Sequence, residues 1–529
     1  MDTKALRQKI LDLAIRGKLV PQDPNDEPAS VLLERIRAEK QQMVKEGKLK
    51  AKDIKNDTVI FKGDDNLHYE QFSDGTVKCI EDEIPFELPD GWAWCRVGSI
   101  TQFIRNGANI KQDKEAQGYP ITRIETISNG EINTEKFGYA NIFELEKFEK
   151  YLLHIDDILM SHINSPVHLG KSAIYDGNYE TPIIHGMNLL CIRLVEKSSS
   201  YYLLYAFRTS LFKDFVWENM KQAVNQASIT TASISSFLLP LAPFNEQRRI
   251  TKTIKQYTNL IDRIENDKTN LQQILSVTKS KILDLAIRGK LVPQDPNDEP
   301  ASVLLERIRA EKEELIKQGK IKRDKKESVI FKGDDNSYYE KIGNKLENID
   351  NIIPFEIPDS WQWCRGYSCF AGMESEKPSG EFFDYIDIDA IDNHLHRIKK
   401  TKRMLVSNAP SRASRVVKTG SVLFSLVRPY LENIALIDEK YENSIASTGF
   451  YVCNSSGVLY PEYMFCLMIS GYVVNGLNQF MKGDNSPSIS KDNIENWLYP
   501  IPPFNEQKII CNKIKRLFSE IEAIEKSLS

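Results

Sequence analysis

Apolar residues recur every three or four positions along a long stretch that begins near residue 250. The steps of three and four alternate, with Lys268 and Thr278 as the polar interruptions and no Pro or Gly inside, which is the spacing of a coiled-coil seam. We expect Asn245 to cap this helix and Gly289 to end it, over a length of roughly 65 Å. The apolar positions are Ile250, Ile254, Tyr257, Ile261, Ile264, Leu271, Leu275, Ile282 and Leu285.

The C-terminal stretch begins the same pattern and stops after about half of it. The missing half is at the other end of the chain, because Leu6, Ile10 and Leu13 match the later part of the first helix. We therefore expect the N-terminal helix to dock near the C-terminal one, which would make the chain a covalent pseudo-dimer. The C-terminal apolar positions are Ile510, Ile514, Leu517, Ile521, Ile524 and Leu528.

An internal repeat organises the whole chain. Residues 9–40 recur unchanged at 281–312, and shorter matches occur in the same order after them. Between these matches the halves diverge, although strand-like segments still align, such as 156–161 with 420–425. We infer two copies of one α/β domain with different surfaces, set in nearly identical frames. The shorter matches are 59–66 with 329–336, 84–96 with 353–365, and 240–247 with 500–507.

The repeat predicts an α/β fold with two similar domains, long antiparallel coiled-coil helices between them, and a pseudo-twofold relation from internal duplication. The predicted parts are 1–83 (N-terminal helix and first frame segment), 84–244 (first variable domain), 245–289 (central helix), 290–352 (second frame segment), 353–504 (second variable domain) and 505–529 (C-terminal helix).

Composition narrows the class of protein. The chain has 529 residues, 41% hydrophobic and 27% charged, which suggests two to four domains of an ordinary soluble protein. No apolar run approaches the roughly 20 residues that span a bilayer, and no signal peptide is recognised, so we expect the cytoplasm. The net charge of −4 does not suggest a non-specific nucleic-acid coat. The eight cysteines include no CxxC pair, which argues against a metal site and against a disulfide framework.

The sequence lacks the motifs of the catalytic subunits that act on DNA. A methyltransferase needs a glycine-rich cofactor loop and an Asn-Pro-Pro-aromatic motif, and an ATPase needs GxxxxGK[ST]. Neither is present, since Asp12 and Asp284 stand where the first glycine of the ATPase motif belongs. His394 and His396 have no Cys or acidic cluster beside them at metal-site spacing. We therefore expect a protein without a catalytic site, a bound cofactor or a metal.

The chain resembles the specificity subunits of Type I restriction–modification systems over its full length. The matching elements are PLAPFNEQ (240–247) and PIPPFNEQ (500–507), each before a heptad helix, together with the two LDLAIRGKLVPQ segments. The resemblance implies two target-recognition domains that each read one half of a split double-stranded DNA sequence. It also implies two methyltransferase subunits, with S-adenosylmethionine, and ATP-dependent translocase and nuclease subunits, with ATP and Mg, as partners.

Polar residues at strand ends and turns are the candidates for DNA contact, because base edges and phosphates need donors and acceptors. The SHINS stretch at 161–165 directly follows an apolar strand, although a solvated loop would look the same. The candidates of the first domain are Asn106, Lys111, Arg123, Ser161, His162, Asn164, His185, Asn188, Gln226 and Ser228.

The second domain is more basic at the corresponding positions. SLVRPY at 425–430 takes the place of SHINSP, and we interpret the Lys-rich run at 397–403 as a phosphate contact. A charge run can equally be solvated surface. The candidates are Lys399, Lys400, Arg412, Arg415, Arg428, Lys482 and Asn485.

The helices are the candidates for partner binding, through Ile250, Ile261, Leu271, Ile282, Ile514 and Ile521. The repeated segment DPNDEPASVLLERIRAEK predicts a short amphipathic helix in each frame, either a packed frame element or a docking surface for the methyltransferase subunits. A different interpretation of the whole chain is a non-enzymatic coiled-coil scaffold that binds protein. That alternative predicts no base-reading loops and no salt-sensitive affinity for DNA.

Overall fold

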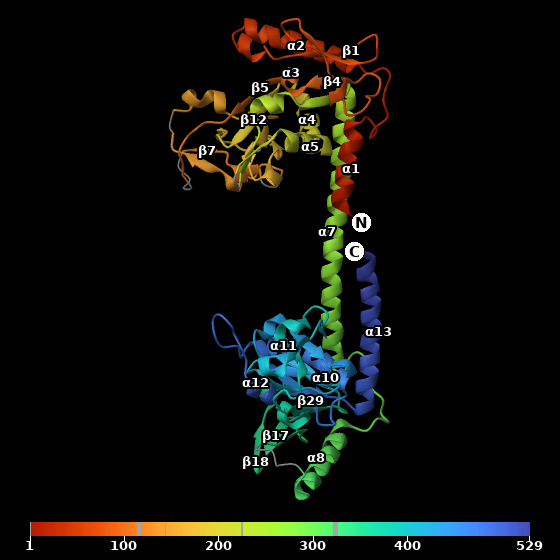
Figure 1. Cartoon of the computed structure of the whole chain (residues 1–529). Coiled ribbons are helices and arrows are strands. Elements are labelled where there is room, and N and C mark those ends of the chain that lie inside the picture. Colours follow the sequence, from red (N-terminus) through yellow and green to blue (C-terminus); the bar gives the residue numbers. More distant parts are fainter. Residues whose placement is uncertain are drawn as a thin grey trace. The chain divides into compact units, whose positions relative to one another are not determined.

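One long helix, α7 (Phe244–Ile287), joins the two halves of the chain, which form two units, Met1–Asp267 and Lys268–Ser529 (Figure 1). The computed structural model describes residues 2–113, 118–127, 130–142, 144–223, 226–320 and 326–528. No helix within these ranges is long and apolar enough to cross a membrane. The predicted N-cap is wrong, because α7 already begins at Phe244 and Asn245 lies inside it. Gly289, at φ 68°, follows the helix end as predicted.

In unit 1, α7 packs against α1 (Thr3–Ile15). Ala14 and Ile15 share one core with Ile250 and Ile254. Towards the other end of the contact, Arg7 Nη2 lies 2.6 Å from Asp262 and 2.9 Å from Glu265. The two helices therefore run antiparallel, with an apolar end and a charged end to their contact.

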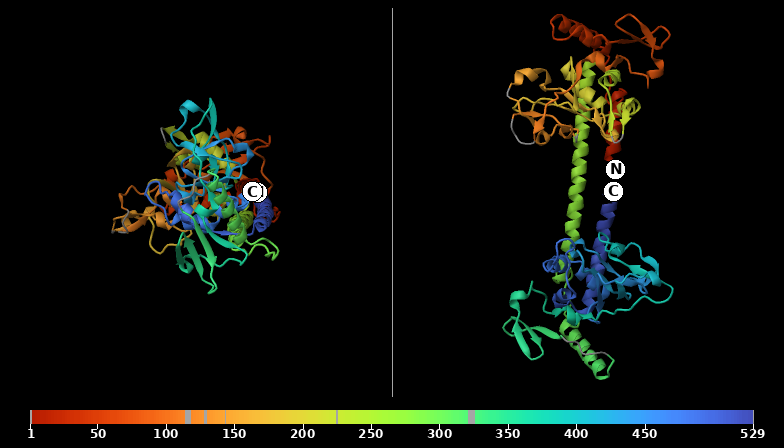
Figure 2. Two further views of the ribbon diagram at one scale, coloured as in Figure 1. Left: turned by 90° about the horizontal axis from the view of Figure 1, so that it is seen from below. Right: turned by 60° about the vertical axis from the view of Figure 1, so that its left-hand side comes forward.

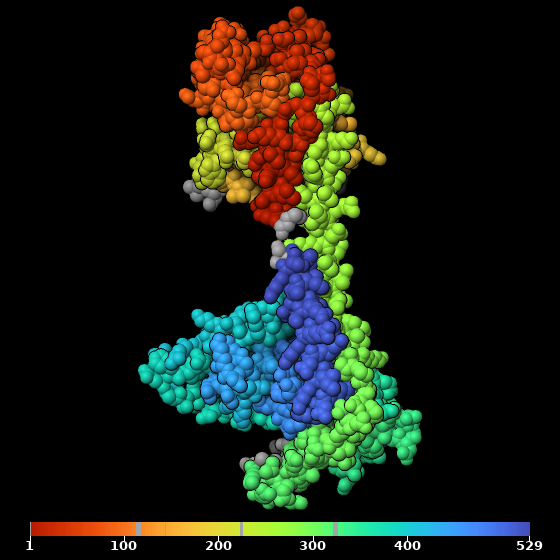
Figure 3. Space-filling view, turned by 90° about the vertical axis from the view of Figure 1, so that its right-hand side faces the viewer, coloured from red at the N-terminus to blue at the C-terminus, as the bar shows by residue number. Residues whose placement is uncertain are grey.

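In unit 2, the later part of α7 packs against α13 (Phe504–Leu528) (Figures 2 and 3). Ile514 and Ile521 share a core with Leu275 and Ile282. An ion pair joins the same two helices, since Lys279 Nζ of α7 lies 2.8 Å from a carboxylate oxygen of Glu525. The first part and the later part of α7 thus each pack against a separate short helix, which provides the opposing residues of the seam.

The central sheet of unit 1 is antiparallel, in the order β11-β9-β12-β5, and both of its faces are buried. Ile158 and Met160 face the core that contains α4 and α5, while Leu159 faces a second core, as strand alternation requires. The remaining strands of the unit form smaller sheets around this one. The helices are α2 (Ala29–Lys45), α3 (Val97–Ile100), α4 (Ser200–Ala206), α5 (Ser210–Asn219) and α6 (Thr231–Ser235), and the strands are β1 (Val59–Lys62), β2 (His68–Gln71), β3 (Val77–Cys79), β4 (Ala93–Arg96), β5 (Thr101–Asn106), β6 (Gln112–Asp113), β7 (Tyr119–Ile121), β8 (Gly138–Ala140), β9 (Ile158–Ser161), β10 (Ile163–Asn164), β11 (Ser172–Ile174), β12 (Leu189–Leu194), β13 (Lys221–Ala223), β14 (Gln226–Ser228) and β15 (Leu238–Leu241).

Unit 2 repeats this plan with the sheet β20-β29-β26-β27. Val422 and Phe424 share a core with α10 and α11, while Leu423 faces a second core. The helices are α8 (Ala301–Lys317), α9 (Gly366–Cys369), α10 (Pro461–Met468), α11 (Gly471–Asn478) and α12 (Lys491–Asn496), and the strands are β16 (Ser328–Lys332), β17 (Tyr338–Ile342), β18 (Lys345–Asn348), β19 (Gln362–Arg365), β20 (Phe370–Ala371), β21 (Phe382–Ile386), β22 (Ile391–Asp392), β23 (Arg397–Ile398), β24 (Lys402–Leu405), β25 (Ala413–Val416), β26 (Val422–Ser425), β27 (Ile434–Leu436), β28 (Ile445–Ser447), β29 (Phe450–Ser455) and β30 (Leu498–Ile501).

Each frame segment forms a three-stranded sheet that is held to its unit by an arginine bound to a buried glutamate. In unit 1, Arg96 of β4 donates from Nε and Nη2 to Glu70 of β2, at 3.0 and 2.7 Å. In unit 2, Arg365 of β19 makes the same two bonds to Glu340 of β17, at 3.1 and 2.7 Å. Such bidentate pairs fix orientation as well as distance, so the frame sheet sits in the same way in both units.

The FNEQ motif at the start of each long helix anchors the frame to the seam. The indole N–H of Trp92 donates to buried Glu246 at 3.0 Å, and that of Trp361 donates to buried Glu506 at 2.9 Å. Burial raises the pKa of both carboxyl groups. In unit 2, Gln294 donates a second bond to Glu506 at 2.7 Å. The motif therefore marks a buried carboxylate that accepts a hydrogen bond from a tryptophan.

The variant Trp92→Phe is expected to lower the free energy of unfolding of unit 1 by about 1–3 kcal/mol, because Glu246 loses its indole donor. Trp361→Phe, the matched variant, is expected to cost less because Gln294 still donates to Glu506. The indole hydrogen bond stabilises the ionised form of Glu246. The loss of stability in Trp92→Phe should therefore grow as pH rises through the raised pKa of Glu246. Urea unfolding of both variants between pH 5 and 8 measures this. Equal, pH-independent penalties would contradict it.

Candidate nucleic-acid interface

Strand ends converge at one end of the central sheet of unit 1. Ser161, the last residue of β9, pairs with Leu189, the first residue of β12, and Leu190 pairs with Asn106, the last residue of β5. Asn106 and Asn188 are both exposed there. The fold thus brings together two predicted DNA-contacting residues that are far apart in the sequence.

A second pair of segments joins at the same end. β10 pairs with β14, with Ile163 opposite Ser228 and Asn164 opposite Ala227. Gln226 at the start of β14 is exposed, and Asn164 and Ser228 are half-buried. The predicted residues Asn164, Gln226 and Ser228 are therefore neighbours.

Two predicted residues lie on segments next to these strand ends. Lys111 is exposed just before β6, and Arg123 is half-buried after β7, where its Nε lies 3.5 Å from Glu125. Neither belongs to the strands that meet at Asn106, but Thr122, next to Arg123, accepts a hydrogen bond from the backbone N–H of Gly186 at 2.9 Å, two residues before Asn188. Their role in DNA contact stays a prediction.

Three predicted residues of unit 1 are buried. Ser161, His162 and His185 are 1%, 6% and 1% exposed. Burial lowers the pKa of both histidines, and the Nδ1 of His185 lies 2.9 Å from the carbonyl oxygen of Tyr151. Neutral, enclosed rings cannot act as surface cations. In this conformation the three side chains support the loop from beneath and do not reach a base, contrary to the role predicted for them.

Unit 2 forms the same convergence with different residues. β26 ends at Ser425, which pairs with Phe450, the first residue of β29. The loop after β26 pairs Val427 with Ser488, and the guanidinium of Arg428 donates to the carbonyl oxygen of Asn485 at 2.9 Å. The exposed predicted residues that gather here are Arg412, Arg428, Lys482 and Asn485.

The other basic residues of unit 2 lie elsewhere. Lys399 and Lys400 are exposed between β23 and β24. Arg415 is half-buried on β25, where its Nη1 donates to Ser375 Oγ at 2.9 Å. Arg415 therefore has a structural partner, Ser375, whereas the two lysines lie exposed on a separate segment, and their contact with phosphate stays a prediction.

The loops also present apolar side chains that are not among the predicted contacts. Val167, in the loop after β10, is 82% exposed, and Tyr430, in the matching loop of unit 2, is 47% exposed. In the sequence, these two exposed residues could have been found from the proline just before each of them, Pro166 and Pro429. A proline stiffens a turn and exposes the residue after it.

The structure corrects the prediction that six side chains of the helices bind a partner. Ile250, Ile261, Ile282, Ile514 and Ile521 are buried, and Leu271 is half-buried. Those that belong to a core pack within their own unit, so they hold its helices together. Other apolar residues of α7 are exposed, since Leu260, Ile274 and Val277 are 50%, 59% and 63% exposed.

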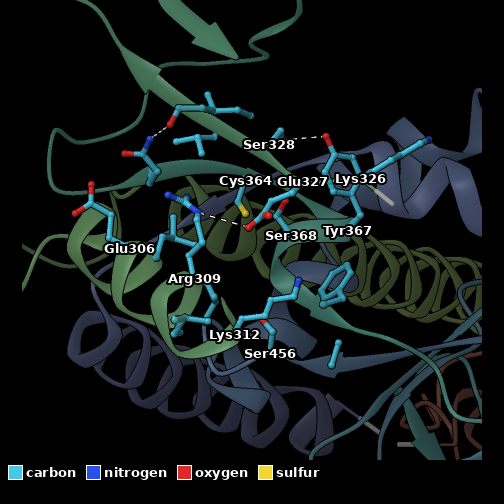
Figure 4. A pocket seen from close by; sticks show the side chains of 18 of the residues that line it. Glu306, Arg309, Lys312, Lys326, Glu327, Ser328, Cys364, Tyr367, Ser368 and Ser456 are labelled. Atoms are coloured by element: carbon cyan, nitrogen blue, oxygen red, sulfur yellow. Dashed lines mark hydrogen bonds and ion pairs between the residues drawn. The ribbon is translucent and has the colours of Figure 1, made fainter. Parts of the chain in front are cut away.

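A cavity of about 440 Å³ lies in unit 2 beside α8, β16 and the turn from β19 to α9 (Figure 4). Its lining mixes charges of both signs, and Arg309 Nε lies 3.8 Å from Glu327. The hydroxyl of Tyr367 donates to Ser328 Oγ at 2.9 Å across one wall. These groups hold no nucleophile–base pair, and the described residues of the chain contain no cluster of three metal-ligating side chains.

Unit 1 closes the corresponding space with a lysine. Lys40, the counterpart of Lys312, is 1% exposed, and its Nζ lies 2.6 Å from Asp57 and donates to the carbonyl oxygen of Gly98 at 2.9 Å. Tyr367 stands where unit 1 has Gly98, and Lys312 is only half-buried. The cavity of unit 2 thus coincides with several sequence differences between the two frames, of which Gly98 and Tyr367 are one pair and Asp57 and Glu327 another.

Comparisons with known proteins return specificity subunits of Type I restriction systems. The family model described as Type I restriction modification DNA specificity domain matches residues 89–273. The chain is 28% identical to the Type I restriction enzyme EcoAI specificity subunit of Escherichia coli, over 97% of this chain and 88% of that one. It is 26% identical to the EcoEI specificity subunit of Escherichia coli, over 99% and 90%. Among solved structures, the HsdS subunit of Thermoanaerobacter tengcongensis is 34% identical over 33% of this chain and 46% of that chain, with a TM-score of 0.31.

Lys40→Ala is expected to loosen α2, because Asp57 would stay largely buried without its cation, a loss of about 3 kcal/mol. Lys312→Ala, the matched variant in the identical segment, is expected to cost less than about 1 kcal/mol since Lys312 is half-buried. Hydrogen exchange of the backbone amides of α2 and α8, followed in each variant, measures the loss of protection in both helices. Equal losses of protection in both helices would show that Lys40 contributes no special anchor.

Proposed function

The chain belongs to the family of Type I restriction–modification specificity subunits, and on that premise we propose that each unit reads one half of a split DNA target. A protein of this family recognises DNA and is not itself an enzyme. The observation that carries the proposal is the convergence of exposed polar residues at the same sheet end in both units, around Gln226 in unit 1 and Arg428 in unit 2.

Unlike chemistry at matching positions supports an asymmetric target. Unit 1 offers amides, such as Asn106 and Gln226, which suit the N6 and N7 edge of adenine. Unit 2 offers Arg412 and Arg428, which suit the O6 and N7 edge of guanine. The helices would set the distance between the half-sites, in the way that dimer geometry does in other DNA-binding proteins.

The proposed partners are double-stranded DNA, two methyltransferase subunits and ATP-dependent restriction subunits. S-adenosylmethionine, ATP and Mg would be bound by those subunits and not by this chain. Docking would use the exposed apolar side chains of α7 or the outward faces of α2 and α8, whose sequences are identical from residue 29 to 40 and from 301 to 312. Two equal faces would suit two equal partners.

The test is selection of bound sequences from a random DNA library by the full-length chain with co-expressed methyltransferase subunits. Two short motifs at a fixed gap are expected. Replacing residues 97–239 with those of a relative of different specificity should change one motif and leave the other intact, because each unit has its own loops. Weak, sequence-blind binding that disappears with added salt, with the partners present, would refute the proposed function.

The double variant Lys399→Ala, Lys400→Ala is expected to weaken binding to all sequences alike, because lysines contact phosphates and carry no base information. The slope of log affinity against log salt should become shallower by about 2, one for each lost phosphate contact. Fluorescence anisotropy titrations at several salt concentrations measure this. A change in the selected motif, with the slope unaltered, would instead assign the two lysines to base reading.

A further inference from the structure

The loop after β26 contains two left-handed residues that are not glycine. Arg428 has φ 47° and ψ 56°, and Glu432 has φ 54° and ψ 38°, on either side of the short turn Pro429–Leu431. Side chains with a Cβ rarely adopt this region. The strain is sharper at Arg428, since a residue before proline is also biased towards extended backbone. Such strain persists only where the surroundings impose it, and it concentrates at functional sites.

Neighbouring loops impose this conformation from two sides. On one side, the backbone N–H of Arg428 donates to Pro487 O at 2.8 Å, and its Nη2 donates to Asn485 O at 2.9 Å. On the other side, the amide of Asn393 donates to Leu431 O at 2.8 Å. Pro429 is buried beneath the turn. The loop is thus held as a rigid element, and the guanidinium at its exposed edge has one donor committed to the protein.

Unit 1 builds the corresponding loop without this feature. The same backbone bond precedes it in both units, from Ile229 N to His162 O at 3.0 Å and from Ile489 N to Leu426 O at 2.9 Å. Asn164 takes the place of Arg428 and turns inward, where its amide donates to Ser161 Oγ at 3.2 Å and its carbonyl oxygen accepts from the next backbone N–H at 2.8 Å. The outward, strained residue belongs to unit 2 alone among these matched positions.

We propose that Arg428 reads a guanine in the half-site of unit 2, an inference that rests on the proposed function. A guanidinium presents a fork of fixed geometry that matches O6 and N7 of guanine, and an aimed fork needs a rigid backbone. A phosphate can accept the same fork, and the base and salt dependence of binding separates that contact from guanine reading. The left-handed backbone at Arg428 is therefore the device that directs the fork, and Asn485 and Pro487 position it.

Arg428→Asn is the central variant, because Asn accepts left-handed backbone and is the residue that unit 1 carries at this place. Arg428→Lys keeps the charge and removes the fork. Lys440→Asn is the control, an exposed cation beyond the far end of β27. Each variant is prepared as the full-length chain with co-expressed methyltransferase subunits, and its thermal unfolding is compared with that of the wild type.

The measurement combines library selection with 7-deazaguanine, which lacks the N7 acceptor, placed at each guanine of the half-site of unit 2. At one guanine the wild type should lose about tenfold in affinity, the size of one good base contact. Arg428→Asn should bind both DNAs equally and accept other bases there, while its half-site for unit 1 stays unchanged. Arg428→Lys should fall between the two, and Lys440→Asn should match the wild type.

Two results would overturn the assignment. One is a uniform loss of affinity for every sequence with a shallower salt dependence, which would place Arg428 on a phosphate. The other is an unchanged half-site of unit 2 in Arg428→Asn. If the wild type selects no half-sites at all, the proposed function fails and the role of Arg428 in it fails too. If both half-sites are selected and only the 7-deazaguanine effect is missing, the guanine assignment alone is refuted.

Discussion

A helix of the length of α7 is stable in water only where its apolar stripe is covered, and the chain covers it with two separate short helices. α1 packs on the first part and α13 on the later part, each within its own unit. The recognition domains depend on this arrangement. Each is tied to the start of a seam helix by a tryptophan that donates to a buried glutamate, and each frame sheet is tied to its domain by a bidentate arginine.

Much of this architecture could be predicted from periodicity and repetition. The seam, the paired half helices and the two related domains all leave regular patterns in the sequence, because burial repeats every few residues. The burial of Ser161 and His162 could not be predicted in the same way. A polar stretch after a strand looks alike whether it faces solvent or lies beneath its own loop, and only the pairing of β10 with β14 decides between them.

Individual substitutions explain where the two copies differ. Gly98 lets Lys40 reach a backbone carbonyl in unit 1, and Tyr367 occupies that place in unit 2. Asn164 closes its own turn, and Arg428 cannot do so because a guanidinium has no acceptor. The helix residues show a different limit of prediction from sequence. The heptad pattern identifies much of the seam, but Tyr257, Ile264 and Ile524, which it also includes, are 45%, 38% and 43% exposed. The pattern does not say whether the surface that covers the buried positions belongs to the same chain or to another.

The loops at the sheet ends have a consequence for how such a protein can change over generations. Arg428, Lys482 and Asn485 are exposed, and the cores beneath them are made by residues of the strands and helices. Replacing an exposed loop residue removes little buried surface, so folding tolerates the exchange. On the proposed function, a changed loop residue would alter the half-site that a unit reads while the frame and its core stay the same. Specificity would then evolve separately from the architecture that holds the chain together.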